Sequence, residues 1–187
     1  MMTIKPISTV RQALSRLDAA IANETSPRNR AMLEIFRKHW WGEVTNDLDM
    51  IMTTLPTEDV HYRFDGHPFV MGEKVEFHTT GEARAMYQRV SDAGDHMAGS
   101  FDDERWAFGE WGLMFEATLH GIYHGRLFAD RVPGLDSEGL YLISYRSVSL
   151  HPMDIQTRQM LGEIVYSGSP LGFEAVGADT LATVFDI

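Results

Sequence analysis

The chain of 187 residues contains no cysteine. This absence excludes disulfides, catalytic thiolates and metal sites built on cysteine. The sequence also lacks the run of about eighteen apolar residues that a membrane-spanning helix needs. The N-terminal segment shows no apolar stretch of the kind found in signal peptides, so we expect a cytoplasmic protein.

Basic residues are few: 16 lysines and arginines stand against 27 acidic residues, for a formal net charge of −11. Binding to nucleic acid or to an anionic membrane requires a positive field, so we expect neither as a partner. No glycine-rich phosphate loop, HExxH helix or GxSxG elbow occurs, and we therefore expect no cofactor and no metal. His120 and His124 lie on one predicted strand, where four residues span roughly 13 Å, too far to share an ion.

What is present is the composition of a packed globular protein, with 44% hydrophobic and 11% aromatic residues. The first third has helical spacing, which predicts a helix over 8–24, a second from about Arg28 and a short third around 48–55. Pro27 interrupts the first pattern. The inward face of the second helix carries Ile35, Phe36, His39, Trp40 and Glu43.

After Pro56 the apolar period changes to two, which predicts a hairpin that turns at residues 65–68. Thr79 and Glu82 have the spacing of a capping box at the start of another helix. Four strands are then predicted, over 97–108, 113–128, 140–150 and 159–166. The moderately apolar segment 169–187 is either a lid or a loose tail.

Helices followed by long strands predict an α+β fold, in which a curved, mixed and mostly antiparallel sheet wraps around N-terminal helices to form a cone-shaped pocket. We expect one domain over 1–187. It comprises a helical extension over 1–27, a core over 28–168 and the tail over 169–187.

The segments "VTNDLDMIMTTLPTEDVHYRFDGHPFV" and "TTGEARAMYQRV" resemble the SnoaL-like members of the nuclear transport factor two-like superfamily. The resemblance covers roughly residues 30 to 168. It rests on the helix, the turn at Asp47, the acidic pair Glu58-Asp59, the alternating strand and the helix that ends near Tyr87. The resemblance implies the cone fold and a homodimer or homotrimer. It does not select one activity, because such folds host isomerases, dehydratases, cyclases, epoxide hydrolases and non-enzymes.

Within that superfamily the sequence is most similar to the scytalone dehydratase branch. His96, followed by Gly99, matches the catalytic histidine that opens the first long strand of that branch. Tyr62-Arg63 matches its first-strand tyrosine and arginine, and His120 falls near its second pocket histidine. The branch also keeps an aspartate near the end of the long helix. Here Val44 stands at that position, with Glu43 beside it.

These matches give candidate roles, each with a plain alternative. His96 would shuttle a proton, although it could be an exposed loop histidine beside Asp95. Glu43 would orient His96 or act as the base, although it could be a surface residue. Tyr62 would bind a substrate oxygen unless it belongs to the core. His120 lies on the polar face of its strand, which favours the outer side of the sheet, but a polar pocket would also explain it. The candidate wall residues are Trp40, Phe64 and Trp106.

The resulting hypothesis is a cofactor-independent lyase, isomerase or cyclase that abstracts a proton from a small, largely apolar, oxygenated molecule. One alternative is a non-catalytic protein that binds a small hydrophobic ligand in the same fold. An epoxide hydrolase is a further alternative, although the Arg-x-Asp arrangement of that branch is not found at a matching place. The last alternative is a scaffold protein that dimerises through the outer face of its sheet.

Overall fold

The computed structural model describes residues 7–66, 74–94, 98–128, 130, 132–177, 184 and 186. Three helices come first: α1 (Val10–Asn23), α2 (Pro27–Val44) and α3 (Leu48–Met52); α4 (Thr80–Asp92) follows the first two strands. Side-chain caps fix where they begin. Thr9 and Gln12 form a capping box at α1, and Ser26 caps α2, which has Pro27 in its first turn. The capping box predicted for Thr79 and Glu82 is confirmed at α4.

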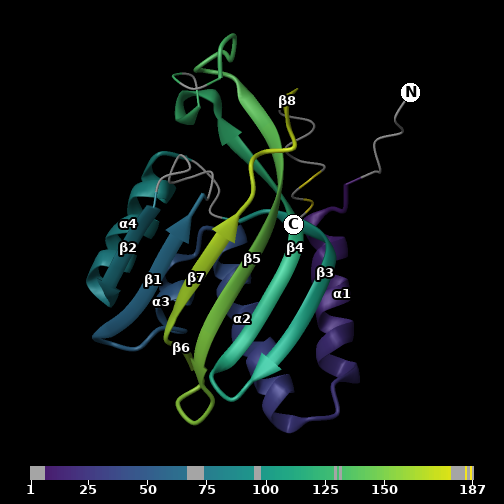
Figure 1. Ribbon diagram of the computed structural model, residues 1–187, viewed down its shortest axis with the longest axis vertical. Helices are drawn as coiled ribbons and strands as arrows, with labels where there is room; N and C mark the ends of the chain where they lie inside the picture. The colour runs from purple at the N-terminus through teal and green to yellow at the C-terminus, as the bar shows by residue number, and fades with distance from the viewer. Residues whose placement is uncertain are drawn as a thin grey trace.

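The strands form one eight-stranded sheet. They are β1 (Asp59–Asp65), β2 (Lys74–Thr79), β3 (Ser100–Gly109), β4 (Gly112–His124), β5 (Leu140–Asp154), β6 (Gln159–Met160), β7 (Gly162–Ser167) and β8 (Gly172–Val176). The main order is β2-β1-β7-β5-β4-β3, and β6 and β8 pair with β5. Only β1 and β7 run parallel among these pairs. Figure 1 shows α1 and α2 on one face of this sheet, which confirms the predicted α+β cone.

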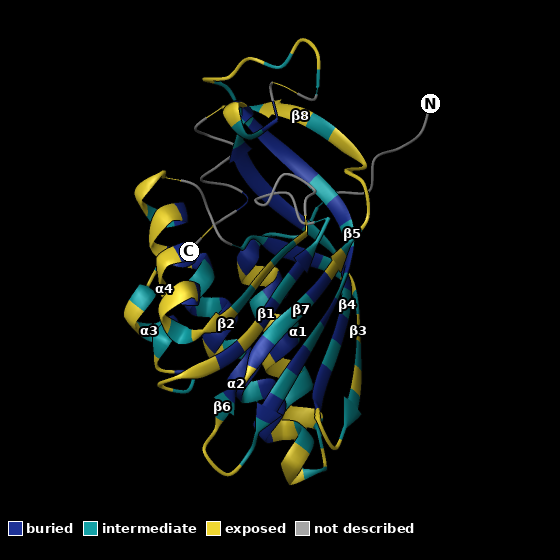
Figure 2. Cartoon of the chain, turned by 60° about the vertical axis from the view of Figure 1, so that its left-hand side comes forward, coloured by how far each residue is buried: buried dark blue, intermediate teal, exposed yellow. Residues whose placement is uncertain are grey.

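The two faces of the sheet follow from alternation along the strands. In β4 the side chains of Phe115 and Ala117 are buried, whereas Glu116 and Thr118 are only half-buried. Phe115 packs against Phe36 of α2, with ring centroids 5.0 Å apart. The inner face therefore belongs to the helices, and the polar even-numbered face of β4 is the outer one. Figure 2 shows buried residues along the strands and exposed residues on the free sides of the helices.

Several predicted boundaries differ in the structure. The strand predicted over 113–128 ends at His124, where a 3₁₀ turn, Gly125–Leu127, begins. The strand predicted over 159–166 divides into β6 and β7. It breaks because the Leu161 amide donates to the Pro152 carbonyl and Gly162 has a φ of +141°. The predicted hairpin pairs β1 with β2, but part of its turn, 67–68, lies outside the described residues.

As far as Val176 the C-terminal segment is not a loose tail, and its role as a lid stays a prediction. Its strand β8 pairs with the first residues of β5, from Leu140 to Ser144. In the described part of the chain no helix is both long and apolar enough to cross a membrane.

Candidate acid–base site

A small cavity lies between α2 and the inner face of the sheet. Its volume is about 60 Å³. Its wall is lined by Phe36, His39, Trp40, Glu43, Phe64, Ala98, Gly99, Phe101, Phe115, Leu119, Tyr145, Ser147, Ser149, His151, Glu163 and Val165. The cavity can hold a molecule of few atoms, or part of a larger one.

Two of the polar wall residues come from adjacent turns of α2. His39 and Glu43 are four residues apart, so both project from the same side of the helix. The His39 side chain is 3% exposed and the Glu43 side chain 16%, and Nε2 lies 3.5 Å from Oε1. An imidazole and a carboxylate are thus held together in a largely dry space.

A chain of hydrogen bonds links these two groups to their surroundings. The Thr54 hydroxyl donates to the Ile51 carbonyl, so it accepts from Nδ1 of His39, at 2.6 Å in both cases. The other ring nitrogen, Nε2, lies 3.0 Å from the Tyr87 hydroxyl, which donates to Glu43 at 2.9 Å. The chain offers a path along which a proton can move between His39 and Glu43.

Tyr62 lies behind this chain and is fully buried. Its hydroxyl is 3.4 Å from that of Tyr87 and 3.5 Å from Nε2 of His39. Burial raises the pKa of Tyr62 and Tyr87 well above the usual range; Glu163 adds to the shift of Tyr62, and Glu43 adds to that of Tyr87. Both phenols therefore stay protonated. Tyr62 is not part of the cavity wall, whereas the buried Tyr145 is.

Glu163 brings a second carboxyl group to the cavity from β7. Its position depends on Gly162, where any Cβ would lie 2.0 Å from the carbonyl oxygen of His61 on β1. The Glu163, Glu43 and His39 ligand atoms all lie within 4.8 Å of one another. Burial raises the pKa of Glu163 well above its usual range, and the Glu43 charge adds to the effect. Glu163 therefore holds a proton more readily than an exposed glutamate does.

His151 of β5 completes the polar wall. Its Nε2 lies 2.8 Å from the Ser149 hydroxyl and 4.0 Å from Oε1 of Glu163. Burial, with a smaller contribution from the nearby His39, lowers the pKa of His151 to about 3. His151 is therefore neutral near pH 7.

The structure places the other predicted site residues in three ways. Trp40 and Phe64 line the cavity, and Trp40 Nε1 donates to the Gly99 carbonyl at 3.2 Å. Trp106 is not among the cavity residues; it packs in the core, stacked on Phe115 at 4.5 Å between ring centroids. His96 lies outside the described residues, and its predicted partnership with Glu43 stays a prediction.

His120 lies in a different pocket, on the outer side of the sheet, so the structure does not group it with Tyr62 and Glu43. Its Nδ1 is 2.7 Å from the Ser144 hydroxyl and its Nε2 is 3.2 Å from Asp102. This outer pocket has a volume of about 550 Å³ and is lined by Ile7, Asp102, Asp103, Thr118, His120, Leu142, Ser144, Leu171, Gly172, Phe173 and Glu174. The strand register explains the placement, because β4 pairs His120 with Ser144.

Sequence reasoning missed Glu163, Tyr87 and His151 as site residues and treated His39 only as part of a helix face. The spacing of His39 and Glu43 was a local signal that could have found the first pair. Glu163 carried no such signal, because its position depends on the inward alternation of a strand that joins β1 and β5.

Two clusters among the described residues have the composition and spacing of metal ligands. One is the interior trio of His39, Glu43 and Glu163, and the other is His61, Glu76 and His78 on the surface. In the interior trio both ring nitrogens of His39 already have hydrogen-bond partners. That arrangement favours proton transfer over metal binding.

The fold and the cavity together define an α+β cone with a buried acid–base cluster. No protein-family model and no curated protein matches the sequence. Solved structures do match the fold. A protein from Shewanella putrefaciens CN-32, assigned as a SnoaL-like polyketide cyclase, superposes with a TM-score of 0.59 at 13% identity over 89% of this chain and 92% of its own.

A second protein with that assignment, from Shewanella denitrificans OS-217, gives a TM-score of 0.55 at 14% identity over 73% of this chain and 90% of its own. A third protein, from Xanthomonas campestris pv. campestris and assigned as a polyketide cyclase, superposes with a TM-score of 0.52. Its identity is 13% over 74% of this chain and 91% of its own. The chain therefore shares the fold of these SnoaL-like proteins.

Proposed function

We propose that the protein is a cofactor-independent enzyme that moves a proton on a small oxygenated molecule by general acid–base catalysis. The reaction class is elimination, isomerisation or ring closure, each of which begins when a base removes a proton next to a carbonyl or a leaving group. The polyketide cyclase assignment of structures with the same fold supports this class.

The observation that carries the proposal is the pair of carboxyl groups at the cavity wall. Glu163 has a raised pKa, which suits it to donate a proton, and Glu43 beside it is then the group that accepts one from carbon. Two carboxyl groups whose environments differ in this way divide the roles of acid and base. Glu43 is then the base, Glu163 returns a proton to the product or leaving group, and Tyr145 polarises the substrate oxygen. Tyr62 is a positioning residue that acts through His39 and Tyr87.

Proton abstraction can be measured before the natural substrate is known. The full chain is incubated in D₂O with a panel of small cyclic diketones, β-ketoesters and hydroxyketones, and exchange of the proton next to the carbonyl is followed by NMR. We expect exchange above the buffer rate, and Glu43→Gln should lower the catalysed rate at least about 100-fold. Glu58→Gln, at an exposed glutamate away from the cavity, is the matched control and should leave the rate unchanged.

His96→Ala separates the two candidate bases. If His96 is the base, as the resemblance implies, its replacement should also cost at least about 100-fold. If the carboxyl pair suffices, His96→Ala keeps most of the exchange activity while Glu43→Gln loses it. Full activity in Glu43→Gln would overturn the role proposed for the carboxyl pair.

Activity should not depend on a metal ion. Dialysis against EDTA, followed by the exchange assay in metal-free D₂O, should leave the rate within about twofold of that of untreated protein. The cluster already holds two carboxyl groups, an imidazole and phenols, which are sufficient for acid–base work. Loss of exchange on chelation, with recovery on adding Zn²⁺, would contradict a cofactor-independent reaction.

A non-catalytic ligand-binding protein is the second candidate function. The outer pocket favours it, because a volume of about 550 Å³ with Leu142, Leu171 and Phe173 in its wall suits a small apolar ligand. A ligand recovered unchanged from the purified protein, with no exchange on any panel compound, would support this function over the enzyme.

A further inference from the structure

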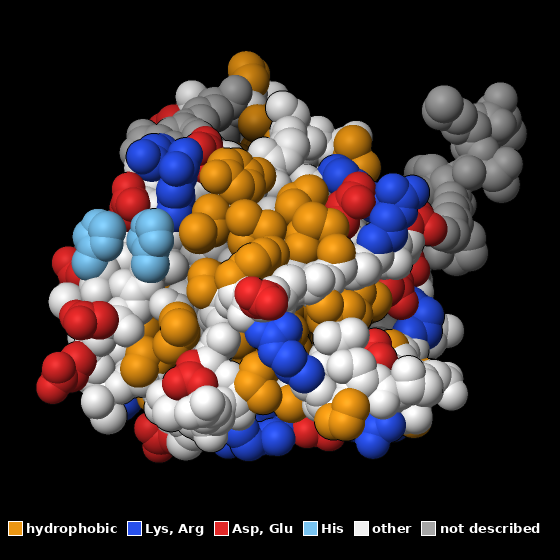
Figure 3. All heavy atoms as spheres, turned by 60° about the horizontal axis from the view of Figure 1, so that its bottom comes forward, with side chains coloured by type: hydrophobic (Ala, Val, Ile, Leu, Met, Phe, Trp, Pro, Cys, Tyr) orange, Lys and Arg blue, Asp and Glu red, His pale blue; other side chains and the backbone are white. Residues whose placement is uncertain are grey.

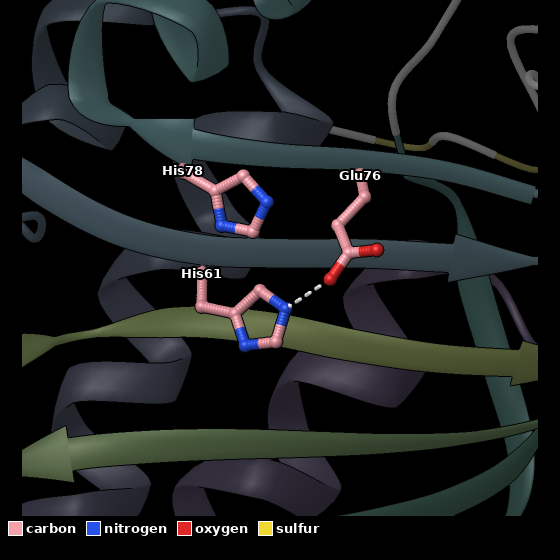
Figure 4. Close-up of side chains that lie close together, drawn as sticks. All are labelled: His61, Glu76 and His78. Atoms are coloured by element: carbon pink, nitrogen blue, oxygen red, sulfur yellow. Dashed lines mark hydrogen bonds and ion pairs between the residues drawn. The ribbon is translucent and has the colours of Figure 1, made fainter.

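Three potential metal ligands lie together on the outer face of the β1–β2 pair, away from the cavity. His61 comes from β1, and Glu76 and His78 come from β2. All three are exposed. Figure 4 shows the two imidazole rings side by side, with the Glu76 carboxylate turned toward His61.

The backbone explains why these side chains meet. Glu76 and His78 are two residues apart on one strand, so both project from the same face. Across the pair, Tyr62 faces Phe77, and their side chains turn inward toward the core. His61, next to Tyr62, therefore turns outward, at a bulge between Asp59 and Tyr62. Two hydrogen-bonded strands thus hold three ligands on one rigid surface.

The distances suit a small divalent ion. Nε2 of His61 is 2.8 Å from Oε1 of Glu76, and the rings of His61 and His78 stack with centroids 5.4 Å apart. One ligand atom from each of the three residues lies within 4.8 Å of the others. Tetrahedral zinc with bonds of about 2.0–2.1 Å places its ligand atoms about 3.3 Å apart, so modest rotations of exposed side chains would complete the geometry.

A hydrogen bond between His61 and Glu76 explains only two members of the cluster. It does not account for His78, whose ring stacks on that of His61 at an interplanar angle of 18°. Two neighbouring imidazoles with a carboxylate provide the mixed nitrogen and oxygen ligands that transition metals prefer to Mg²⁺ or Ca²⁺.

The electrostatic surroundings are mixed but favour a cation on balance. Lys74 lies 3.5 Å from the second oxygen of Glu76 and opposes binding locally. The chain as a whole carries a formal charge of −11, which attracts cations. In Figure 3 exposed histidine side chains lie at one edge of the face shown, near both acidic and basic ones.

We propose that His61, Glu76 and His78 form a surface binding site for Zn²⁺, with a fourth coordination position open to water. The site is independent of the cavity, so it does not rest on the proposed acid–base function.

The test is a calorimetric titration of the full, untagged chain with ZnCl₂, after dialysis against EDTA and then against metal-free buffer. We expect saturable binding of one ion. His61→Gln and His78→Gln should each weaken the affinity at least about tenfold. Replacing a residue that only hydrogen-bonds a metal ligand already costs about that much affinity, and loss of the ligand itself should cost no less. Co²⁺ should give the visible absorption of a four-coordinate ion in the wild-type protein and lose it in either variant. His124→Gln, on another strand, is the matched control.

Two results would overturn the site. One is a wild-type titration without saturable binding. The other is a titration that superposes on that of the His61→Gln, His78→Gln double variant, because the ion would then lie elsewhere. Glu163→Gln addresses the interior trio directly, and loss of binding in that variant alone would assign the ion to the cavity. The surface substitutions lie on exposed positions, so the variants should unfold at the wild-type temperature.

Discussion

Acidification from about pH 7.5 to about pH 4 should lower the free energy of unfolding by about 3 kcal/mol through His151 alone, because its pKa falls from 6.5 to about 3 on folding. His151 is 2% exposed, so an imidazolium there would lose its hydration. In the unfolded chain the same ring takes up a proton freely below about pH 6.5. As the pH falls from about 6.5 toward about 3, protonation of this ring therefore stabilises the unfolded state progressively.

The sign follows from proton binding. A histidine whose pKa is lowered by folding contributes stability that is fully present above its unfolded pKa and is lost as the pH falls toward its folded pKa. Glu163 acts in the opposite direction, because its raised pKa contributes stability at low pH that is lost as the pH rises. The groups that face His151 are Ser149, Glu163 and His39.

Urea unfolding across this pH range, for the wild-type protein and for His151→Gln, isolates the effect. The wild-type curve should fall more steeply toward acid, by about 3 kcal/mol over the range. Met160→Leu, a substitution of similar volume in the same core, adds no titratable group and should run parallel to the wild type. Parallel curves for the wild-type protein and His151→Gln would show that His151 is not buried in its neutral form.

Replacing Gly162 by alanine should lower the free energy of unfolding by about 3 kcal/mol or more. At a φ of +141° a residue with a side chain is strained, which costs about 1–3 kcal/mol. The new Cβ would also lie 2.0 Å from the backbone oxygen of His61, so β1 and β7 would have to separate locally.

Gly172→Ala is the matched control, because a Cβ at that strand position meets no atom within 4 Å. We expect it to change the free energy of unfolding, measured by urea titration, by no more than about 0.5 kcal/mol. The Gly162 variant should also show weaker catalysed exchange, since Glu163 is the next residue. Equal stability of the two variants would mean that the β1–β7 contact can relax without cost.

The predictions that held depended on local signals. Thr79 and Glu82 belong to one turn, and their spacing marks the start of α4 without reference to the rest of the chain. The polarity of the even-numbered residues of β4 likewise favoured the outer face for His120. These features can be predicted from sequence because neighbouring residues decide them.

The interior cluster depends instead on contacts between distant segments. Glu163 reaches Glu43 only because β7 lies between β1 and β5, an order that no periodicity indicates. The pairing of β8 with the start of β5 was missed for the same reason. Glu43 could be proposed from its helix face, but its partner could not be identified from one strand alone.

The position of β7 also orders events during synthesis. β7 is central in the sheet but among the last strands to be made, and β1 has no neighbour other than β2 in the sheet until β7 arrives. A chain emerging from the ribosome can form α1, α2 and the β1–β2 pair early, because these contacts are local. The contact between Glu43 and Glu163 cannot form until nearly the whole sheet has been synthesised. The carboxyl pair is therefore among the last features to form, and a chain released before β7 would lack both Glu163 and the strand that joins the β1–β2 pair to β5.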